Sequence, residues 1–108
     1  MDIIETIKEQ IAVNPVLLYM KGSPNAPQCG FSARAAEVLK ACGVKFAYVD
    51  ILQNPEIRAS LPKYANWPTF PQLWIGGELV GGSDILIELY EKGELQDMLK
   101  AAAPQADA

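Results

Sequence analysis

The spacing of hydrophobic residues changes several times along the chain, and these changes predict a mixture of helices and strands. Near the N-terminus, isoleucines recur three or four residues apart from Ile3 to Ile11, with charged residues between them. This spacing places them on one face of an amphipathic helix. The helix should end near Asn14, because the residue before a proline disfavours the helical conformation. The continuous apolar run at residues 16–20 instead predicts a buried strand.

The rest of the pattern predicts four more helices and three more strands. Helices are expected over residues 30–41, 55–64, 83–92 and 95–102, and strands over residues 46–51, 72–75 and 78–81. This order predicts an α/β thioredoxin-like fold, a four-stranded mixed sheet flanked by helices on both faces. The crossovers after the first and second strands are expected to give parallel pairing, and the Gly76-Gly77 turn an antiparallel hairpin. Asn54 and the Ser83-Asp84 pair are expected to cap helices.

The composition is that of one globular domain. Half of the 108 residues are hydrophobic and the net charge is −4, so neither nucleic acid nor an anionic membrane surface is an expected partner. The longest apolar run is too short to cross a membrane, and the first residues lack the pattern of a secretion signal. We therefore expect a cytoplasmic protein, with a domain over residues 1–102 and a flexible C-terminal tail over residues 103–108.

Histidine is absent and there are only two cysteines, which narrows the possible chemistry. The absence of histidine excludes Ser-His-Asp catalysis, Cys-His catalysis and histidine zinc sites. Cys29 and Cys42 are too few for a secreted disulfide scaffold. Because they occupy one predicted helix, they should lie roughly 20 Å apart, too far for a disulfide. Cys42 is either a small buried side chain at a helix end or a regulatory or intermolecular thiol.

Cys29 follows a proline-containing loop and opens the predicted helix over residues 30–41. The free N–H groups and the positive end of the helix dipole stabilise a thiolate there, the form that attacks disulfides and binds metals. The sequence CGFS at residues 29–32 has the spacing of a redox C-x-x-C motif whose second cysteine is replaced by serine. Pro71, which opens the third strand, would face this cysteine. That context favours a cis Phe70–Pro71 bond, the alternative being an ordinary trans proline at a strand start.

Four segments of the chain resemble the monothiol glutaredoxins of the CGFS type, in their short single-domain bacterial form. The resemblance covers Ile3 to about Leu99 and rests on KGSP (21–24), PQCGFS (27–32), WPTFPQL (67–73) and GGSD (81–84). It implies a protein that binds glutathione and a [2Fe-2S] cluster, held by one cysteine from each of two subunits and by two glutathione thiolates. It also implies cluster transfer to apoproteins, a BolA-type protein partner and poor disulfide reductase activity.

The same resemblance implies roles for the residues near the thiol. Cys29 would be both the catalytic thiol and the cluster ligand shared with the dimeric partner. Lys21 and Arg58 would bind the glycine carboxylate of glutathione, and Lys21 could also balance the thiolate. The alternative for each of these cations is an ordinary solvated surface charge. Many members of the family have a cysteine where this chain has Ser83, and in some of them it forms a disulfide with the active-site sulfur. Serine removes that option.

The remaining implied contacts come from two later segments of the chain. The main chain of Phe70 would pair with the cysteinyl backbone of glutathione, as a short added strand does. Ser83 and Asp84 would receive the γ-glutamyl carboxylate at a helix start, and Asp84 would also meet the ammonium group. The simpler role for this pair is helix capping. Trp67 and Pro68 are expected to shape the wall of the groove.

Three functions remain open at this point. The first is a cluster carrier. A [2Fe-2S] centre needs four ligands, usually thiolates, and one subunit offers a single suitable sulfur, so the cluster would have to be shared between two chains and external thiols. The second is a glutathione-dependent oxidoreductase that uses Cys29 alone to remove glutathione from proteins. The third is a regulatory adaptor that senses iron through loss of its cluster.

Overall fold

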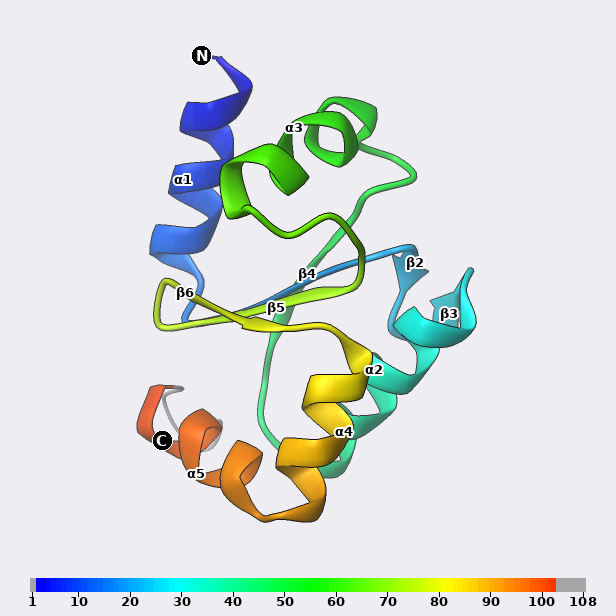
Figure 1. Ribbon diagram of the computed structural model, residues 1–108, viewed down its shortest axis with the longest axis vertical. Helices are drawn as coiled ribbons and strands as arrows, with labels where there is room; N and C mark the ends of the chain where they lie inside the picture. Colours follow the sequence, from blue (N-terminus) through cyan, green and yellow to red (C-terminus); the bar gives the residue numbers. More distant parts are fainter. Residues whose placement is uncertain (1, 103–108) are drawn as a thin grey trace.

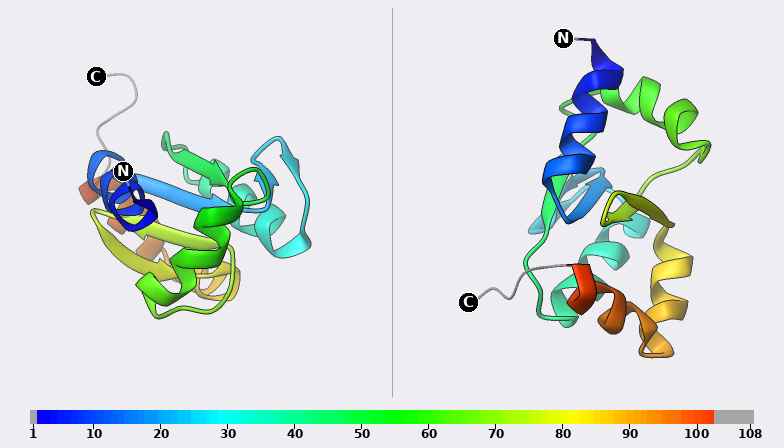
Figure 2. Two further views of the ribbon diagram at one scale, coloured as in Figure 1. Left: turned by 90° about the horizontal axis from the view of Figure 1, so that it is seen from above. Right: turned by 90° about the vertical axis from the view of Figure 1, so that its left-hand side faces the viewer.

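Residues 2–102, which the computed structural model describes, form three layers: a four-stranded sheet with two helices on one face and three on the other (Figure 1). The helices are α1 (Ile3–Val13), α2 (Gly30–Ala41), α3 (Pro55–Ala65), α4 (Ser83–Glu91) and α5 (Glu94–Ala102). The strands are β1 (Val16–Met20), β2 (Gly22–Ser23), β3 (Ala26–Pro27), β4 (Ala47–Asp50), β5 (Gln72–Ile75) and β6 (Glu78–Gly81). The right-hand view of Figure 2 shows α1 and α3 on one side of the sheet and α4 and α5 on the other. The predicted fold class is confirmed.

The sheet has the strand order β4-β1-β5-β6, and its pairing corrects one prediction. Strands β1 and β4 are parallel, as expected for a crossover through α2. The crossover through α3 does not give a second parallel pair, because β5 runs antiparallel to β1. Asp50 pairs with Met20, and Gln72 lies beside Tyr19. The segment containing α3 therefore begins and ends at the same end of β1, so the next strand must run in the reverse direction. The hairpin of β5 and β6 is antiparallel, as predicted.

Strand β1 lies at the centre of the core and contributes to both layers of packing. All five of its residues are buried. Leu18 and its neighbours on the same face pack against α2, α4 and α5. Leu17 and Tyr19 pack on the other face with residues of α1 and α3 and with Trp74 of β5. The continuous apolar run in the sequence reflects this burial on both faces.

Two helix starts differ from the predictions. Asn54 occupies the N-cap position of α3, but its side chain makes no capping bond; its Nδ2 donates to the carbonyl oxygen of Asp50 instead (2.8 Å). Ser83 is the first residue of α4 and not its cap, a position taken by Gly82. The Ser83 side chain is buried, so it does not stand outside the helix end as a cap would.

A small hairpin, β2–β3, precedes α2 and was not predicted. Its strands have two residues each, too few to produce a recognisable alternation of hydrophobic and polar positions. The hairpin projects at one edge of the molecule, beside the end of β1 (Figure 1). The segment that leads to Cys29 is therefore a folded element.

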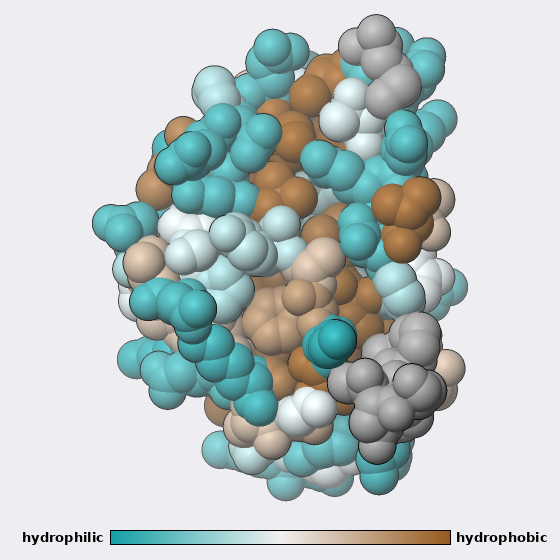
Figure 3. All heavy atoms as spheres, turned by 180° about the vertical axis from the view of Figure 1, so that it is seen from behind, coloured by the Kyte–Doolittle hydropathy of each residue, from teal (hydrophilic) through white to brown (hydrophobic). Residues whose placement is uncertain are grey.

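The face of the molecule opposite the view of Figure 1 carries both hydrophobic and hydrophilic side chains, which intermingle (Figure 3). Phe31 is one of the large hydrophobic side chains that remain exposed, at 56%. None of the helices within residues 2–102 has the length and apolar character needed to cross a membrane. The predicted tail at residues 103–108 lies outside the described residues.

Candidate functional site

Cys29 is the N-cap residue of α2, and its side chain is half-buried. The pKa of its thiol lies below the ordinary value, chiefly because the backbone N–H of Ser32 donates a hydrogen bond to the sulfur. The N–H of Phe31, the charge of Lys21 and the hydroxyl of Ser32 lower the pKa further, whereas burial raises it. The N–H donors belong to the first turn of α2, where they have no partner within the helix. The start of α2 therefore lowers the pKa of the Cys29 thiol, as predicted.

Ser32 occupies the position of the second cysteine in a C-x-x-C motif, and its side chain helps to hold the site in place. It is fully buried, and its Oγ accepts a hydrogen bond from the backbone N–H of Lys21 (3.0 Å). This bond joins the end of β1 to the first turn of α2. The hydroxyl thus fixes the position of Lys21 as well as assisting the thiolate of Cys29.

Cys42 lies at the other end of α2, as its C-cap residue. It is half-buried against the hydrophobic cluster on that face of the sheet, and burial raises the pKa of its thiol. These observations support the interpretation of Cys42 as a small core side chain. With the whole of α2 between them, the two sulfurs are roughly 20 Å apart, so they cannot form a disulfide in the folded protein.

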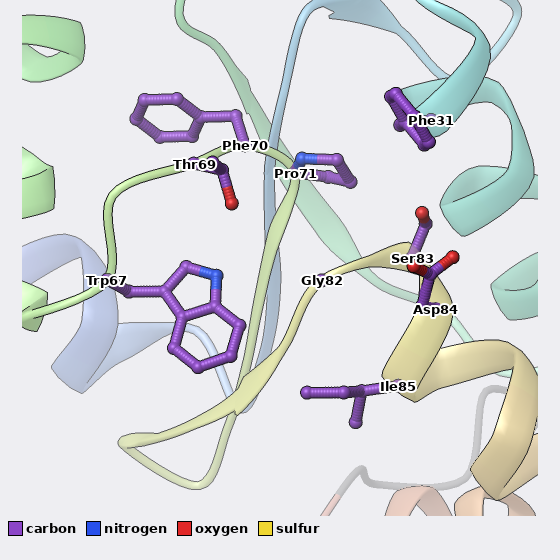
Figure 4. A pocket seen from close by; sticks show the side chains of 9 residues that line it. All are labelled: Phe31, Trp67, Thr69, Phe70, Pro71, Gly82, Ser83, Asp84 and Ile85. Carbon is purple, nitrogen blue, oxygen red and sulfur yellow. The ribbon is translucent and has the colours of Figure 1, made fainter.

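A groove of about 400 Å³ lies between the loop that precedes β5 and the start of α4 (Figure 4). Trp67 and Thr69 form one side, while Ser83 and Asp84 lie opposite them and Phe31 reaches in from α2. The full lining consists of Phe31, Trp67, Thr69, Phe70, Pro71, Gly82, Ser83, Asp84 and Ile85. Because Phe31 follows Cys29 by two residues, the groove begins close to the thiol.

The start of α4 gives the groove its capacity to bind an anion. The N-cap residue Gly82 has no side chain with which to cap the helix, so the N–H groups of the first turn are not occupied by a capping oxygen. Backbone N–H groups and the helix dipole together favour a carboxylate at such a position. The groove can therefore accept a carboxylate-bearing ligand that extends towards Cys29.

The loop on the opposite side of the groove is held by one buried side chain. Gln72 is fully buried, and its Nε2 donates to the carbonyl oxygens of Trp67 (3.1 Å) and Thr69 (3.2 Å). Its Oε1 accepts a hydrogen bond from the indole N–H of Trp74 (3.2 Å). The Phe70–Pro71 bond within this loop is cis, as predicted. Figure 4 shows the Phe70 side chain directed away from Ser83 and Asp84, and it packs against the hydrophobic cluster that includes residues of α1 and α3.

The structure brings together some of the predicted site residues and leaves others apart. Phe70, Ser83 and Asp84 line one groove, whereas Lys21, Arg58 and Cys29 are not among its lining residues. Lys21 is nevertheless close enough to influence the Cys29 thiol. Arg58 is exposed, one turn into α3.

The groove wall also differs in part from the prediction. Trp67 is part of the wall, but Pro68 is not among the lining residues and is exposed. The indole N–H of Trp67 is buried and has no hydrogen-bond partner among the described residues. Four further lining residues were not predicted as parts of the groove: Phe31, Thr69, Gly82 and Ile85. Of these, Gly82 could have been found from its position just before a helix start.

The donor set near Cys29 limits which metal groups this chain can hold. Within the described residues, no group of three or more cysteine, aspartate or glutamate side chains is arranged to bind a metal ion. Cys29 offers one accessible sulfur of lowered pKa, and Cys42 is out of reach. One chain can therefore supply a single thiolate to a metal group, and the other ligands must come from outside it.

Comparison with known proteins agrees with this geometry. A family model described as Glutaredoxin matches residues 16–80. Glutaredoxin 4 of Escherichia coli (strain K12) is 71% identical over 100 residues, which cover 93% of this chain and 87% of that protein. Glutaredoxin 4 of Haemophilus influenzae (strain 86-028NP) is 63% identical over 103 residues, covering 95% of this chain and 96% of that protein. The solution structure of reduced apo GrxS14 from poplar has a TM-score of 0.79 at 43% identity, with 92% of this chain and 91% of that chain covered.

Proposed function

Because the chain belongs to the glutaredoxin family, we propose that it is a monothiol glutaredoxin that binds glutathione and carries a [2Fe-2S] cluster for delivery to apoproteins. The observation that carries the proposal is the isolation of Cys29. Its thiol is activated by the start of α2, while Ser32 takes the place of a second cysteine and Cys42 lies at the far end of the helix. A sulfur with no partner in its own chain is suited to act as a ligand rather than as half of a disulfide.

The glutathione site is proposed to run from Cys29 along the groove. Ser83 and Asp84 would hold the γ-glutamyl end, where the free N–H groups of α4 favour a carboxylate. The main chain of Phe70 would pair with the cysteinyl unit. Lys21 and Arg58 would receive the glycine carboxylate from outside the groove. In this arrangement the thiol of glutathione lies beside Cys29, so that both sulfurs face the same point.

A count of ligands supports the proposed cluster binding. A [2Fe-2S] centre takes four ligands, and Cys29 with one bound glutathione supplies two thiolates. A second copy of the same arrangement supplies the other two, so we propose a homodimer bridged by the cluster. A BolA-type protein would be the alternative second partner. When bound, the cluster is the iron and sulfide cargo that the protein passes on. The role of this chain is to hold one thiolate, orient glutathione and keep both sulfurs accessible in the cytoplasm.

Anaerobic reconstitution with iron, sulfide and glutathione tests this proposal. Wild-type protein should acquire visible absorption, about two iron and two sulfide ions per dimer, and the size of a dimer. Cys29→Ser should remain colourless, whereas Cys42→Ser should reconstitute normally and serves as the matched control. Reconstitution without glutathione should also fail. A colourless monomer under the full conditions, or a Cys29→Ser variant that holds the cluster, would refute the proposal.

A second candidate function is supported by the lowered pKa of Cys29. In a monothiol route, the Cys29 thiolate attacks the mixed disulfide of a glutathionylated protein, releasing the protein thiol and forming a Cys29–glutathione disulfide. A second glutathione then attacks that disulfide, which yields oxidised glutathione and restores the thiolate. An assay coupled to glutathione reductase measures this turnover. Activity near background, together with successful reconstitution, would favour the carrier.

A further inference from the structure

The strand β4 forms one edge of the sheet, and that edge is open. β4 comes first in the strand order β4-β1-β5-β6, so within residues 2–102 it pairs only with β1. The left-hand view of Figure 2 shows it at the margin of the sheet. We propose that this edge binds an extended, acidic segment of another protein, which adds to the sheet as a further strand. None of the residues of β4 lines the groove beside Cys29, so the inference goes beyond the proposed function.

The direction of the backbone groups of β4 shows what the edge offers to a partner. The N–H of Ile51 donates to the carbonyl oxygen of Met20 at 2.9 Å, so every second residue of this segment bonds to β1. The residues between them direct their N–H and C=O groups away from β1, and these residues are Tyr48 and Asp50. The carbonyl oxygen of Asp50 already accepts from the N–H of Gln53 at 3.1 Å. Among the described residues, both backbone groups of Tyr48 and the N–H of Asp50 therefore remain for an added strand.

The two edges of the sheet differ in how they are protected against such pairing. Edge strands are commonly protected by charged side chains, by proline or by a β-bulge. The opposite edge strand, β6, begins with the exposed Glu78 and has an irregular register against β5 next to Trp74. The register of β4 is regular, and the Oδ1 of its one charged residue, Asp50, accepts from the N–H groups of Gly22 and Leu52, both at 2.9 Å. β4 is therefore the less protected edge.

Two hollows flank this edge, one on each face of the sheet. The larger, of about 1140 Å³, is lined by Gln10 of α1 and by Val49, which packs with the cluster on the α1 and α3 side. The smaller, of about 470 Å³, is lined by Lys40 of α2 and by Phe46, which packs with the cluster on the α2 side. Tyr48 lines both hollows and is 46% exposed. Because successive side chains of a strand point to opposite faces, an added strand would direct alternate side chains into the two hollows, as in other peptides bound at sheet edges.

The charges around the smaller hollow favour an acidic ligand. Lys40 and Lys45 line it, and no acidic residue does. Within residues 2–102 neither lysine forms a salt bridge. The Nζ of Lys40 donates instead to two neutral oxygens, the carbonyl of Pro24 (2.9 Å) and the Oδ1 of Asn25 (3.0 Å). A carboxylate on the added strand would therefore meet two positive charges that no carboxylate of the described chain neutralises.

The larger hollow suits an uncharged polar side chain, such as that of threonine. Four residues with side-chain amides line it, namely Gln10, Gln28, Gln53 and Asn54. The expected occupant thus alternates acidic and uncharged polar residues. A second copy of this chain fits less well, because its β4 would bring Asp50 as its one acidic side chain, and that carboxylate is bonded to its own backbone.

A synthetic heptapeptide in which threonine and glutamate alternate, acetylated and amidated at its ends, tests the proposal. One control peptide has lysine in place of each glutamate, and a second has the same composition with the glutamates adjacent to one another. The net charge of the protein is −4, so a general electrostatic attraction would favour the lysine peptide. Binding to isotope-labelled apo protein is followed by NMR, as changes in amide chemical shift and as slower amide exchange at Tyr48 and Asp50.

The alternating glutamate peptide should bind about tenfold more tightly than either control, with the largest changes at Tyr48 and Asp50. Tyr48→Pro removes an outward N–H and no bond to β1, so it should fold and weaken binding by about tenfold. Tyr48→Val keeps that N–H and should stay within about threefold of wild type. Lys45→Glu should weaken binding by about fivefold. Lys100→Glu, at an exposed position of α5, makes the same change of charge elsewhere and is its matched control.

Three outcomes would overturn the inference. The first is equal binding of the glutamate and lysine peptides, or shift changes confined to the groove beside Cys29. The second is undiminished binding to Tyr48→Pro; if that variant does not fold, equal binding to Lys45→Glu and Lys100→Glu has the same meaning. The third is a dimer of apo protein in which the amides of Tyr48 and Asp50 are protected without peptide, because a second copy would then occupy the edge. All measurements are made without iron or glutathione, so cluster reconstitution tests the proposed function independently.

Discussion

Replacing Gln72 by leucine tests whether one buried amide holds the wall of the groove. The substitution keeps the side-chain volume close to that of glutamine, so it leaves little cavity. It does remove the acceptor for the indole N–H of Trp74 and the donor for the carbonyl oxygens of Trp67 and Thr69. Trp74 is only 7% exposed, so its N–H would become a buried donor without a partner.

The expected loss of stability follows from these three groups. A buried donor left unpaired costs about 1–3 kcal/mol. The two carbonyl oxygens belong to a loop that is partly exposed, and water can reach them, so together they add a smaller amount. We expect Gln72→Leu to lower the free energy of unfolding by about 2–4 kcal/mol, a large part of the 5–15 kcal/mol typical of a domain.

Urea unfolding followed by far-UV circular dichroism measures this change directly. Trp67 and Trp74 are the two tryptophans of the chain and both contact Gln72, so native tryptophan emission should change as well. Gln53→Leu, at an exposed glutamine, is the control and should stay within about 0.5 kcal/mol of wild type. In addition, Trp74→Phe should cost less in the Gln72→Leu background than in wild type, because the N–H has already lost its partner. A Gln72→Leu variant as stable as the control, or strictly additive double-mutant energies, would refute the reasoning.

Three further predictions concern the thiols and the hairpin. Iodoacetamide should modify Cys29 before Cys42 at neutral pH, because the pKa of the Cys29 thiol is lowered and that of the Cys42 thiol is raised. Mass spectrometry after partial alkylation measures the order of modification. Modification of Cys42 first would contradict this prediction. The pKa of Cys29 is lower in the folded than in the unfolded state, so its contribution to stability is present above the unfolded pKa and is lost as pH falls through the folded pKa. The difference in unfolding free energy between wild type and Cys29→Ser should therefore grow as pH rises through that window, and a flat difference would contradict it. Gly22→Ala should cost more than about 2 kcal/mol, because its Cβ would lie 2.5 Å from the Ala26 carbonyl oxygen. Gly43→Ala has a similar positive φ but open space around it, so it should cost about 1 kcal/mol in the same urea experiment; equal costs would exclude the steric explanation.

The elements that sequence predicted well are those whose signals are local. The apolar run at Val16–Met20 predicted β1 correctly, and the helix over residues 30–41 agrees with α2 at both ends. The position of Cys29 at a helix start required only the order of neighbouring elements. Pro71 was predicted to be cis from its context, and the structure confirms it.

The features that sequence did not predict depend on contacts between distant residues. The direction of β5 is set by the end of β1 to which the segment containing α3 returns the chain, and no local sequence pattern specifies that end. The contact between Asp50 and Gly22 joins residues 28 positions apart. In the sequence, Asp50 and Gln72 resemble ordinary surface polar residues, and their roles appear only when the fold brings unpaired backbone groups to them. The residues that hold the site in place, such as Asp50 and Gln72, were thus harder to predict than the reactive sulfur of Cys29.

The central position of β1 has a consequence for how the protein fluctuates. The strand is paired with β4 on one edge and β5 on the other, and all its residues are buried. Its amide hydrogens can exchange with deuterium from the solvent only when the whole molecule opens, whereas amides of the two-residue strands β2 and β3 can exchange through local opening. The boundary between slow and fast exchange should fall at Lys21. The segment that joins β1 to the Cys29 helix start can therefore open locally while the strand from which it departs stays closed.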